Sequence, residues 1–367
     1  MKVKKQSKVS RKAIAPVAGA ICSAAETQAV VSAVMSVNKN GSEKKVLIGS
    51  RVADQNSEAA KKRNYLLDDW NGGAFTVQRN NFKHKSLSSW SANPVVGCMH
   101  ACPHCYVSEI VLKQKAKLAE FGVQDPDGEW GDYAFLRVWH EEKFLAALKR
   151  AEAIPSKDLN ADGNRAVMYS TTTDAYQTFR YGNADFRDEK NAQLKTMRRR
   201  SLQLIRDEST LNVRILTRSP LARQDFDLYK SFGNRLMFGM SVPTLDNDLS
   251  KAYEPHSPAP TQRLATLKAA KDQGLNVFVA IAPLFPDCDD EDIRRTLQAV
   301  KDLGVMTIFV EPINIRADNV ERIAAIGRQY GKNLKLDVFD SLERWREYAY
   351  DQLKLVQRIA RELGIAK

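Results

Sequence analysis

The sequence predicts an α/β protein: a partial (β/α)6 barrel of the TIM type, with a basic, partly disordered N-terminal extension and a C-terminal helix. Three observations predict this fold. Short apolar runs alternate with amphipathic helical patterns, six such units occur, and the runs end in polar residues. Apolar strands between amphipathic helices are typical of a parallel sheet covered by helices. Six units suit an open barrel rather than the closed barrel of eight.

The expected elements follow in chain order. The strands lie near Leu87–Asn93 and at Ala166–Ser170, Val213–Leu216, Leu236–Met240, Val277–Ile281 and Thr307–Val310. Helical patterns separate them, for example at Pro260–Asp272 and at Glu291–Leu303, which follows acidic residues that suit a helix N-terminus. The segment Leu342–Ile365 has apolar residues at helical spacing. We expect it to form one helix that closes the open side of the barrel, with partner binding as the alternative.

Three cysteines, Cys98, Cys102 and Cys105, stand close together with the spacing C-x3-C-x2-C. Three thiolates can hold three irons of one cubane iron–sulfur cluster and leave the fourth iron open to a small molecule. A zinc site or a redox dithiol is the alternative, with His100 or His104 as a further zinc ligand. No second C-x-x-C or H-x3–5-H occurs elsewhere in the sequence to complete a usual zinc finger.

Polar residues at the ends of the predicted strands indicate where a site would form. These residues are Thr173, Asp174, Arg218, Ser241 and Glu311. In α/β barrels the site is built from the loops at the carboxyl ends of the strands. We therefore expect these residues to lie with the three cysteines at one end of the barrel, which is called the mouth and is formed by the carboxyl ends of the strands.

The composition bears on membrane insertion and on compartment. No run of 18 or more apolar residues occurs, so no membrane span is expected. Five cysteines, three of them in one loop, favour a reducing, cytoplasmic compartment over a disulfide framework. The other two, Cys22 and Cys288, cannot hold a second cluster. The first 25 residues are basic and then Ala-rich, but Pro16, Gly19 and the lack of leucine make them a poor signal peptide.

The net charge of +12 is uneven along the chain. Residues 1–65 hold 13 Lys or Arg against 4 Asp or Glu, and so carry nine of the twelve net positive charges. A basic arm is the expected footprint of nucleic-acid contact, and a solvated, partly disordered tail is the alternative. The expected division is a basic arm (1–65), a catalytic core (66–330) and a helical C-terminal closure (331–367).

Residues about 87–320 resemble the spore photoproduct lyase-like branch of the radical S-adenosylmethionine (SAM) enzymes, also called DNA repair photolyase-like. Four stretches carry the resemblance: Asn93–Tyr106, Thr172–Gln177, Thr217–Leu221, and Tyr253–Pro255 with Arg263. It implies a [4Fe-4S] cluster ligated by the three cysteines, SAM as the second cofactor, and a reductase or flavodoxin-type electron donor. The implied activity is reductive cleavage of SAM to a 5′-deoxyadenosyl radical, which abstracts hydrogen from a substrate.

The resemblance also implies a role for each matching residue. Thr173 and Asp174 would bind the amino group or ribose of SAM, and Arg218, where the branch usually has Lys, would pair with its carboxylate. Ser241 would hydrogen-bond a ribose hydroxyl or the carboxylate. The backbone near Ala282 would approach the adenine. His104 stands where an aromatic residue is common and would stack near the adenine.

Further implied roles concern the radical and the substrate. Cys288 is a candidate hydrogen donor, with a passive loop cysteine as the alternative, and Tyr106 and Tyr176 are candidates for radical relay or for packing around the cofactor. The implied substrate is DNA carrying a photoproduct. Modification of RNA or of a peptide is an alternative, and so is a non-catalytic iron–sulfur protein that binds nucleic acid. The segment Thr178–Arg180 departs from the branch pattern, so the substrate side of the mouth is expected to differ.

Overall fold

The computed structural model describes residues 65–80, 88–159, 165–305 and 307–365. Its main feature is a seven-stranded sheet in the order β10-β9-β8-β7-β6-β3-β2. Six of its strands run parallel: β3 (Trp90–Ala92), β6 (Ala166–Tyr169), β7 (Asn212–Thr217), β8 (Leu236–Ser241), β9 (Asn276–Leu284) and β10 (Ile308–Pro312). Among the described residues, β10 and β2 (Gln78–Arg79) do not pair, so the sheet is open. The predicted α/β fold with six parallel strands is confirmed.

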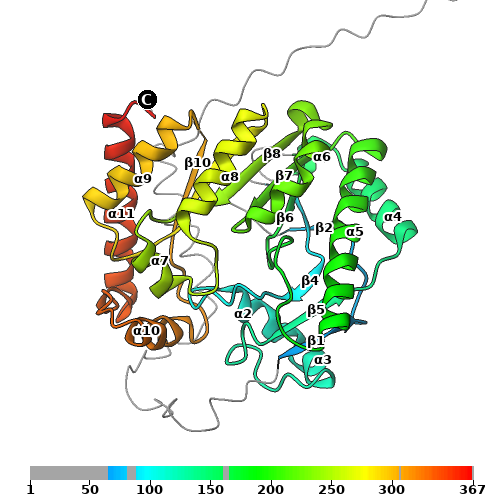
Figure 1. The fold of residues 1–367 in the computed structure, drawn as a ribbon, viewed down its shortest axis with the longest axis horizontal. Coiled ribbons are helices and arrows are strands. Elements are labelled where there is room, and N and C mark those ends of the chain that lie inside the picture. The colour runs from blue at the N-terminus through cyan, green and yellow to red at the C-terminus, as the bar shows by residue number, and fades with distance from the viewer. Residues whose placement is uncertain (1–64, 81–87, 160–164, 306, 366–367) are drawn as a thin grey trace, which may run out of the picture.

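Helices follow the strands and cover the sheet (Figure 1). They are α4 (Glu141–Glu152), α5 (Ala184–Glu208), α6 (Phe226–Lys230), α7 (Asn247–Tyr253), α8 (Pro260–Asp272), α9 (Asp290–Asp302), α10 (Asn319–Gln329) and α11 (Leu342–Glu362), with short 3-10 turns η4 (Ser156–Asp158), η5 (Pro220–Asp225), η6 (Gly233–Arg235) and η7 (Asp337–Phe339). The helix expected at Pro260–Asp272 has those bounds, and the one expected at Glu291–Leu303 is shifted by one residue.

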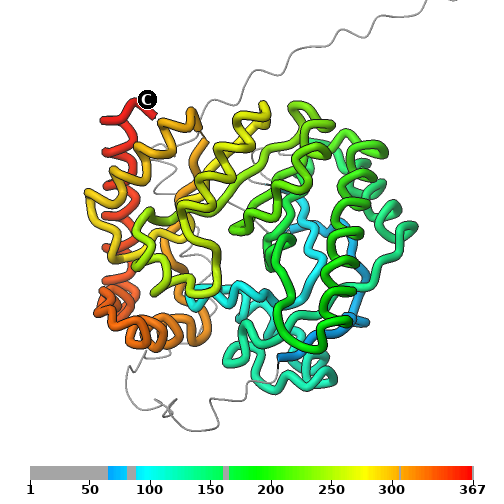
Figure 2. Tube along the Cα trace, in the orientation of Figure 1, coloured from blue at the N-terminus to red at the C-terminus, as the bar shows by residue number. Residues whose placement is uncertain are grey.

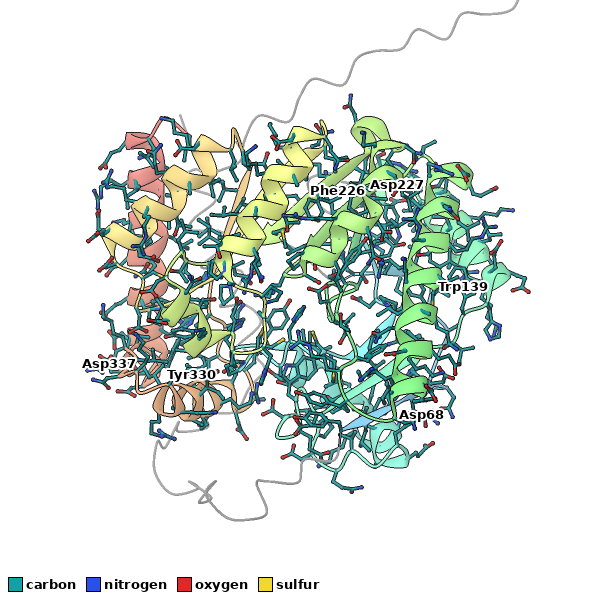
Figure 3. All side chains as sticks on the ribbon, viewed as in Figure 1. Asp68, Trp139, Phe226, Asp227, Tyr330 and Asp337 are labelled. Atoms are coloured by element: carbon teal, nitrogen blue, oxygen red, sulfur yellow. The ribbon has the colours of Figure 1, made fainter. Side chains whose placement is uncertain are left out.

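The core lies between the sheet and its helices. Along β7, Val213 and Ile215 are fully buried, whereas the alternate residue Arg214 is only half-buried. This alternation gives β7 one fully buried face, as the two-residue period of a strand requires. The tube view shows the strands and helices arranged around a central region (Figure 2). Figure 3 places Trp139, which packs on Phe144 of α4, and Tyr330, just after the end of α10, on opposite sides of the molecule.

The C-terminal helix α11 packs against β10 and α9. Trp345 donates a hydrogen bond from Nε1 to the Ile313 carbonyl at 2.7 Å, and Tyr348 donates from its hydroxyl to the Leu284 carbonyl at 2.6 Å. The helix ends at Glu362, earlier than expected, because Gly364 adopts a left-handed conformation with φ of 69°. Among the described residues, no helix has both the length and the apolar character needed to cross a bilayer.

A second, smaller sheet was not expected from the sequence. It has the order β1-β5-β4, formed by Leu66–Trp70, Tyr133–Arg137 and Val95–Gly97. With α2 (Val107–Val111), η3 (Leu112–Gln114) and α3 (Lys115–Glu120) it encloses its own small core, which includes Trp70, Tyr133 and Phe135. Two of the three cysteines, Cys98 and Cys105, pack against this core, so the small sheet forms the base of the loop that carries them.

Candidate functional site

The cysteine loop, residues 98–105, connects β4 to α2 and contacts the residues that follow β6. The backbone N–H of Met99 donates to Oε1 of Gln177 at 2.7 Å, and the Thr173 hydroxyl donates to the Gly97 carbonyl at 2.6 Å. Within the loop, the Cys105 N–H donates to the Cys102 carbonyl at 3.0 Å. The loop is therefore held at the carboxyl end of the parallel strands, where the sequence predicts it.

Gly97→Ala is expected to destabilise the protein more than Gly182→Ala. Both glycines have a positive φ, 92° and 97°, so each alanine costs about 1–3 kcal/mol of backbone strain. A Cβ at Gly97 would also lie 2.2 Å from the carbonyl oxygen of Tyr133 on β5, whereas no atom of the described residues lies within 4 Å of one at Gly182. The midpoint of urea unfolding should fall further for Gly97→Ala, and equal shifts would show that the close approach of β4 and β5 is relaxed at no cost.

The three loop thiols are free, and they differ in acidity. Burial and the nearby Asp174 carboxylate raise the pKa of Cys98. Burial and the neighbouring Cys102 raise the pKa of Cys105 to about 12. Burial also acts to raise the pKa of Cys102, but the Arg218 guanidinium and His104 outweigh it and lower that pKa to about 7. Cys102 is thus the loop thiol that forms a thiolate, the nucleophilic and metal-binding form, at neutral pH.

In the metal-free protein, the alkylation rate of Cys102 is expected to reach half its maximum near pH 7. The rate rises with pH because the reactive thiolate predominates above the lowered pKa, whereas the unreactive thiol predominates below it. Cys105 should reach its half-maximum near pH 12. Mapping iodoacetamide adducts by mass spectrometry over a pH series measures each profile. Arg218→Gln should move the Cys102 profile to higher pH, and a profile that begins to rise only above pH 9 would contradict the expectation.

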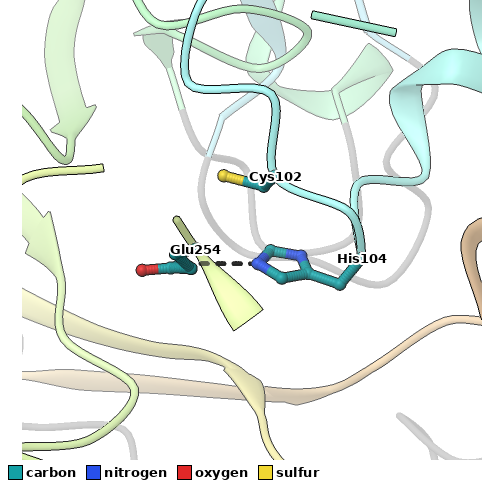
Figure 4. Close-up of side chains that lie close together, drawn as sticks. All are labelled: Cys102, His104 and Glu254. Carbon is teal, nitrogen blue, oxygen red and sulfur yellow. Dashed lines mark hydrogen bonds and ion pairs between the residues drawn. The ribbon is translucent and has the colours of Figure 1, made fainter. Parts of the chain in front are cut away.

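Beside the loop lies a buried charged cluster centred on Glu254, whose side chain is fully buried. Oε1 of Glu254 lies 2.7 Å from Nε of Arg218, and Oε2 lies 2.6 Å from Nη2 of Arg263. Oε1 also lies 3.3 Å from Nε2 of His104, the contact that Figure 4 shows as a dashed line beside Cys102. The charges of Arg218 and Arg263 hold the pKa of this carboxyl well below its usual range, although burial acts in the opposite direction. Two guanidinium groups face this one carboxylate, so a positive charge remains to stabilise a further anion, such as the Cys102 thiolate.

The side chains of Cys102, His104 and Glu254 are close enough to hold a metal ion together, since their ligand atoms lie within 4.8 Å of one another. Arg218 and Arg263, however, engage both oxygens of Glu254 and would repel a divalent cation. The donor set that fits better is the three soft thiols, because their cluster carries negative charge that Arg218 can compensate. The residues present therefore fit an iron–sulfur cluster better than a zinc ion.

Asp174 is the centre of a second buried network. Its carboxylate accepts hydrogen bonds from the Thr217 hydroxyl at 2.7 Å, the Tyr176 N–H at 2.8 Å and the Arg218 N–H at 2.9 Å. Nε2 of His100 lies 3.1 Å away. Burial acts to raise the pKa of Asp174, but the contact with His100 and the backbone N–H groups lower it to about 2. The carboxylate therefore ties the loops after β6 and β7 to the cysteine loop.

Arg218, Ser241 and Ala282 meet at the ends of β7, β8 and β9. The Ser241 hydroxyl donates to the Ala282 carbonyl at 2.7 Å, and Nη2 of Arg218 lies 3.4 Å from the same oxygen. Nη1 of Arg263 donates to the Ser241 carbonyl at 3.0 Å. The Arg218 side chain keeps 20% of its surface exposed. It is therefore the cation of this group that a ligand entering the mouth can reach.

Two expected residues lie outside these networks. Cys288 is 1% exposed within the main core, and its Sγ lies 4.0 Å from the Pro243 carbonyl. Burial and Asp292 raise its pKa well above that of an ordinary thiol. The role of hydrogen donor stays a prediction for this packed residue. Glu311, the other one, accepts a hydrogen bond from the Asn314 side chain at 2.9 Å.

Sequence reasoning missed several residues around the loop that come from distant segments. Ser257, Asn319 and Arg322 contact the loop itself. Asp127 contacts Arg322. The Ser257 hydroxyl, for example, lies 3.6 Å from Sγ of Cys102. In the sequence these are ordinary polar residues of loops and of a helix, and the only signal was that Ser257 lies near the Tyr253–Pro255 stretch.

Comparison with known proteins agrees with this geometry. The sequence pattern of the Radical SAM superfamily matches residues 92–300. The chain is 30% identical over 252 residues to "Uncharacterized protein ORF301" of Acidianus two-tailed virus, a match that covers 66% of this chain and 73% of the viral protein. It is 25% identical over 198 residues to "Uncharacterized protein MJ0683" of Methanocaldococcus jannaschii, covering 54% of this chain and 61% of that protein.

Among solved structures, a spore photoproduct lyase variant with bound AdoMet and dinucleoside spore photoproduct is similar in fold. Its TM-score is 0.56 at 12% sequence identity, over 86% of this chain and 85% of the lyase. At 12% sequence identity, this structural similarity shows a shared fold and no more. The superfamily pattern, in contrast, spans more than half of the chain and includes the cysteine loop. The chain therefore belongs to the radical SAM superfamily, and it is an enzyme whose cofactors are a [4Fe-4S] cluster and SAM.

Proposed function

We propose that this radical SAM enzyme acts on a nucleic acid, by hydrogen abstraction of the kind that reverses a DNA photoproduct. The observation that carries the proposal is the combination of the cysteine loop and the Glu254 cluster in a fold like that of spore photoproduct lyase. The excess of positive charge in residues 1–65 supports a polyanionic substrate, because neutralising phosphates releases their counterions. Those residues lie outside the described structure, apart from Tyr65.

Within the mouth, we propose that Arg218 binds the carboxylate of SAM. Its side chain is partly exposed and is anchored through Nε by Glu254, and its Nη2 lies 3.4 Å from the Ala282 carbonyl. A guanidinium can hold a carboxylate through two parallel hydrogen bonds. Ser241 and the Ala282 backbone lie beside it and are proposed to contact the ribose and the adenine.

The remaining predicted residues have proposed roles that follow from their contacts. Thr173 and Asp174 would border the amino group or ribose of SAM while holding the loop in place. His104 would face the adenine, with its Nε2 fixed by Glu254. Both His104 and Asp174 are buried. When bound, the cluster and SAM together supply the reductive cleavage that yields a hydrogen-abstracting radical.

We further propose that the enzyme works in the cytoplasm and is reduced by a flavodoxin-type protein or a reductase. The four cysteines in the described part of the chain are all free, which suits a reducing compartment.

The substrate assignment predicts that UV-irradiated DNA accelerates 5′-deoxyadenosine release more than intact DNA, RNA or a peptide mixture does. The assay uses the full chain, reconstituted without air and reduced with dithionite in the presence of SAM, and measures 5′-deoxyadenosine by chromatography. A matched arm with irradiated DNA and no dithionite gives the background. Equal release with irradiated and intact DNA would exclude lesion repair, and a selective response to RNA would favour RNA modification.

A further inference from the structure

The first turn of α10 contacts the cysteine loop from more than 200 residues further along the chain. Asn319, at its first position, is fully buried. Its Nδ2 donates to the His104 carbonyl at 3.2 Å and to the Asn314 carbonyl at 2.7 Å. Its Oδ1 accepts from the Arg316 N–H at 3.1 Å, which fixes the amide with its donors facing the cysteine loop.

Arg322, one turn later, contacts the carbonyl groups on either side of His104. Its Nε donates to the Pro103 carbonyl at 3.2 Å, and its Nη2 donates to the Cys105 carbonyl at 3.3 Å and to the Ser108 hydroxyl at 3.1 Å. Together, Asn319 and Arg322 bind three consecutive carbonyl oxygens, those of Pro103, His104 and the third cysteine, Cys105. The planar fork of a guanidinium can span these acceptors, whereas the point charge of a lysine cannot.

The charge of Arg322 is balanced by a third segment. Nη1 of Arg322 lies 2.5 Å from Oδ1 of Asp127, whose side chain is 5% exposed. Oδ2 of Asp127 accepts from the Asp318 N–H at 3.0 Å. The pair therefore joins α10, the cysteine loop and the segment between α3 and β5. Because it is largely buried, removing one partner leaves the other charge uncompensated.

We propose that Asn319 and Arg322 are positioning residues of the iron–sulfur centre. They fix the backbone between Cys102 and Cys105 in the shape that binds the cluster, and the Arg322–Asp127 pair sets the local charge that the cluster experiences. Residues that orient metal ligands from outside the ligand shell affect metal affinity in this way. The proposal concerns the cluster alone and is independent of the substrate.

The test measures how fast the reconstituted full-length protein loses iron to a chelator under anaerobic conditions. Arg322→Lys keeps the charge but removes the fork. Asn319→Asp has the same shape but turns carboxylate oxygens toward the His104 and Asn314 carbonyls. Each should accelerate iron loss about 10–100-fold. Arg328→Gln, on the exposed side of the same helix, is the matched control and should leave the rate unchanged.

A second readout separates charge from geometry. Arg322→Gln leaves the Asp127 carboxylate unpaired near the loop, so the reduction potential of the cluster should become more negative. Adding Asp127→Asn removes that charge and should restore the potential, while iron loss stays fast because the carbonyl contacts are still missing. A double variant whose potential stays as negative as that of Arg322→Gln would refute the charge role.

Two results would overturn the positioning role. One is iron loss from Arg322→Lys and Asn319→Asp at the wild-type rate. The other is that Gly182→Ala, which changes none of these contacts, accelerates iron loss equally when it lowers the melting temperature of the metal-free protein by the same amount. In that case the two residues would stabilise the fold only, and circular dichroism of the metal-free variants provides this comparison.

Discussion

Cys102→Ala is expected to abolish reductive cleavage of SAM. The rate of 5′-deoxyadenosine formation should fall by at least about a thousandfold, because the cluster supplies the electron for that cleavage. The reason is the ligand count: two thiolates cannot retain a cluster that three hold at three of its irons. Reconstituted wild-type protein should bind about four iron atoms per chain. The variant should bind almost none and should lack the visible absorbance of the cluster. Cys98→Ala and Cys105→Ala should behave alike.

Cys288→Ala is the matched control, because Cys288 is a free cysteine outside the loop. It should keep the iron content and the visible spectrum of the wild type. The same variant tests the predicted hydrogen donor: if Cys288 has that role, 5′-deoxyadenosine should still form while repaired product does not accumulate. Retention of a full cluster by Cys102→Ala would mean that this thiol is not a ligand, and the assignment of the three cysteines would then be wrong.

The fold could be predicted because its signals are local. Each parallel strand is a short apolar run bounded by polar residues. Helix α9 is amphipathic and is capped by Asp289, and helix α8 begins at Pro260, a residue favoured at the first helical position. The small sheet could not be predicted in the same way. Its first strand, Leu66–Trp70, has two consecutive acidic residues and no alternation, and it is stabilised by pairing with Tyr133–Arg137 far along the chain. Such pairing depends on tertiary context rather than on propensity.

The site shows the same division between local and distant information. The cysteine spacing is a local pattern and indicates a cluster by itself, and the polar ends of parallel strands necessarily meet at one edge of the sheet. The networks that hold them are not local. Glu254 lies 36 residues from Arg218 and 150 residues from His104 along the chain, and Arg322 lies 217 residues from Cys105. A buried carboxylate and a surface carboxylate look alike in a single sequence, so these partners appear only in the structure.

Glu254→Gln and Arg218→Gln are each expected to weaken SAM binding about 10–100-fold, because a charge-assisted hydrogen bond contributes about 1.5–3 kcal/mol. Arg218→Gln removes the proposed carboxylate partner. Glu254→Gln leaves Arg218 in place but removes the anion that fixes its Nε. If Glu254 acts only by orienting Arg218, the double variant should bind SAM no more weakly than Arg218→Gln alone. Once Arg218 is replaced, Glu254 has no guanidinium left to orient, so its loss adds no further cost. Equilibrium binding of SAM to the reconstituted protein measures the cycle.

The exposed ion pair between Arg200 and Glu141 provides the control for this cycle. Its partners lie 2.5 Å apart but are 43% and 38% exposed, so Glu141→Gln should change SAM affinity very little. Glu254→Gln leaves Arg218 and Arg263 without their shared carboxylate. If that variant does not fold, Arg218→Lys replaces it as the test, because lysine keeps the positive charge. It should weaken binding less than Arg218→Gln, since a single ammonium can attract the carboxylate but cannot make the two parallel bonds. If the losses of binding free energy in the two single variants add in the double variant, Glu254 and Arg218 contribute to SAM binding separately. In that case Glu254 does not act by orienting the Arg218 guanidinium.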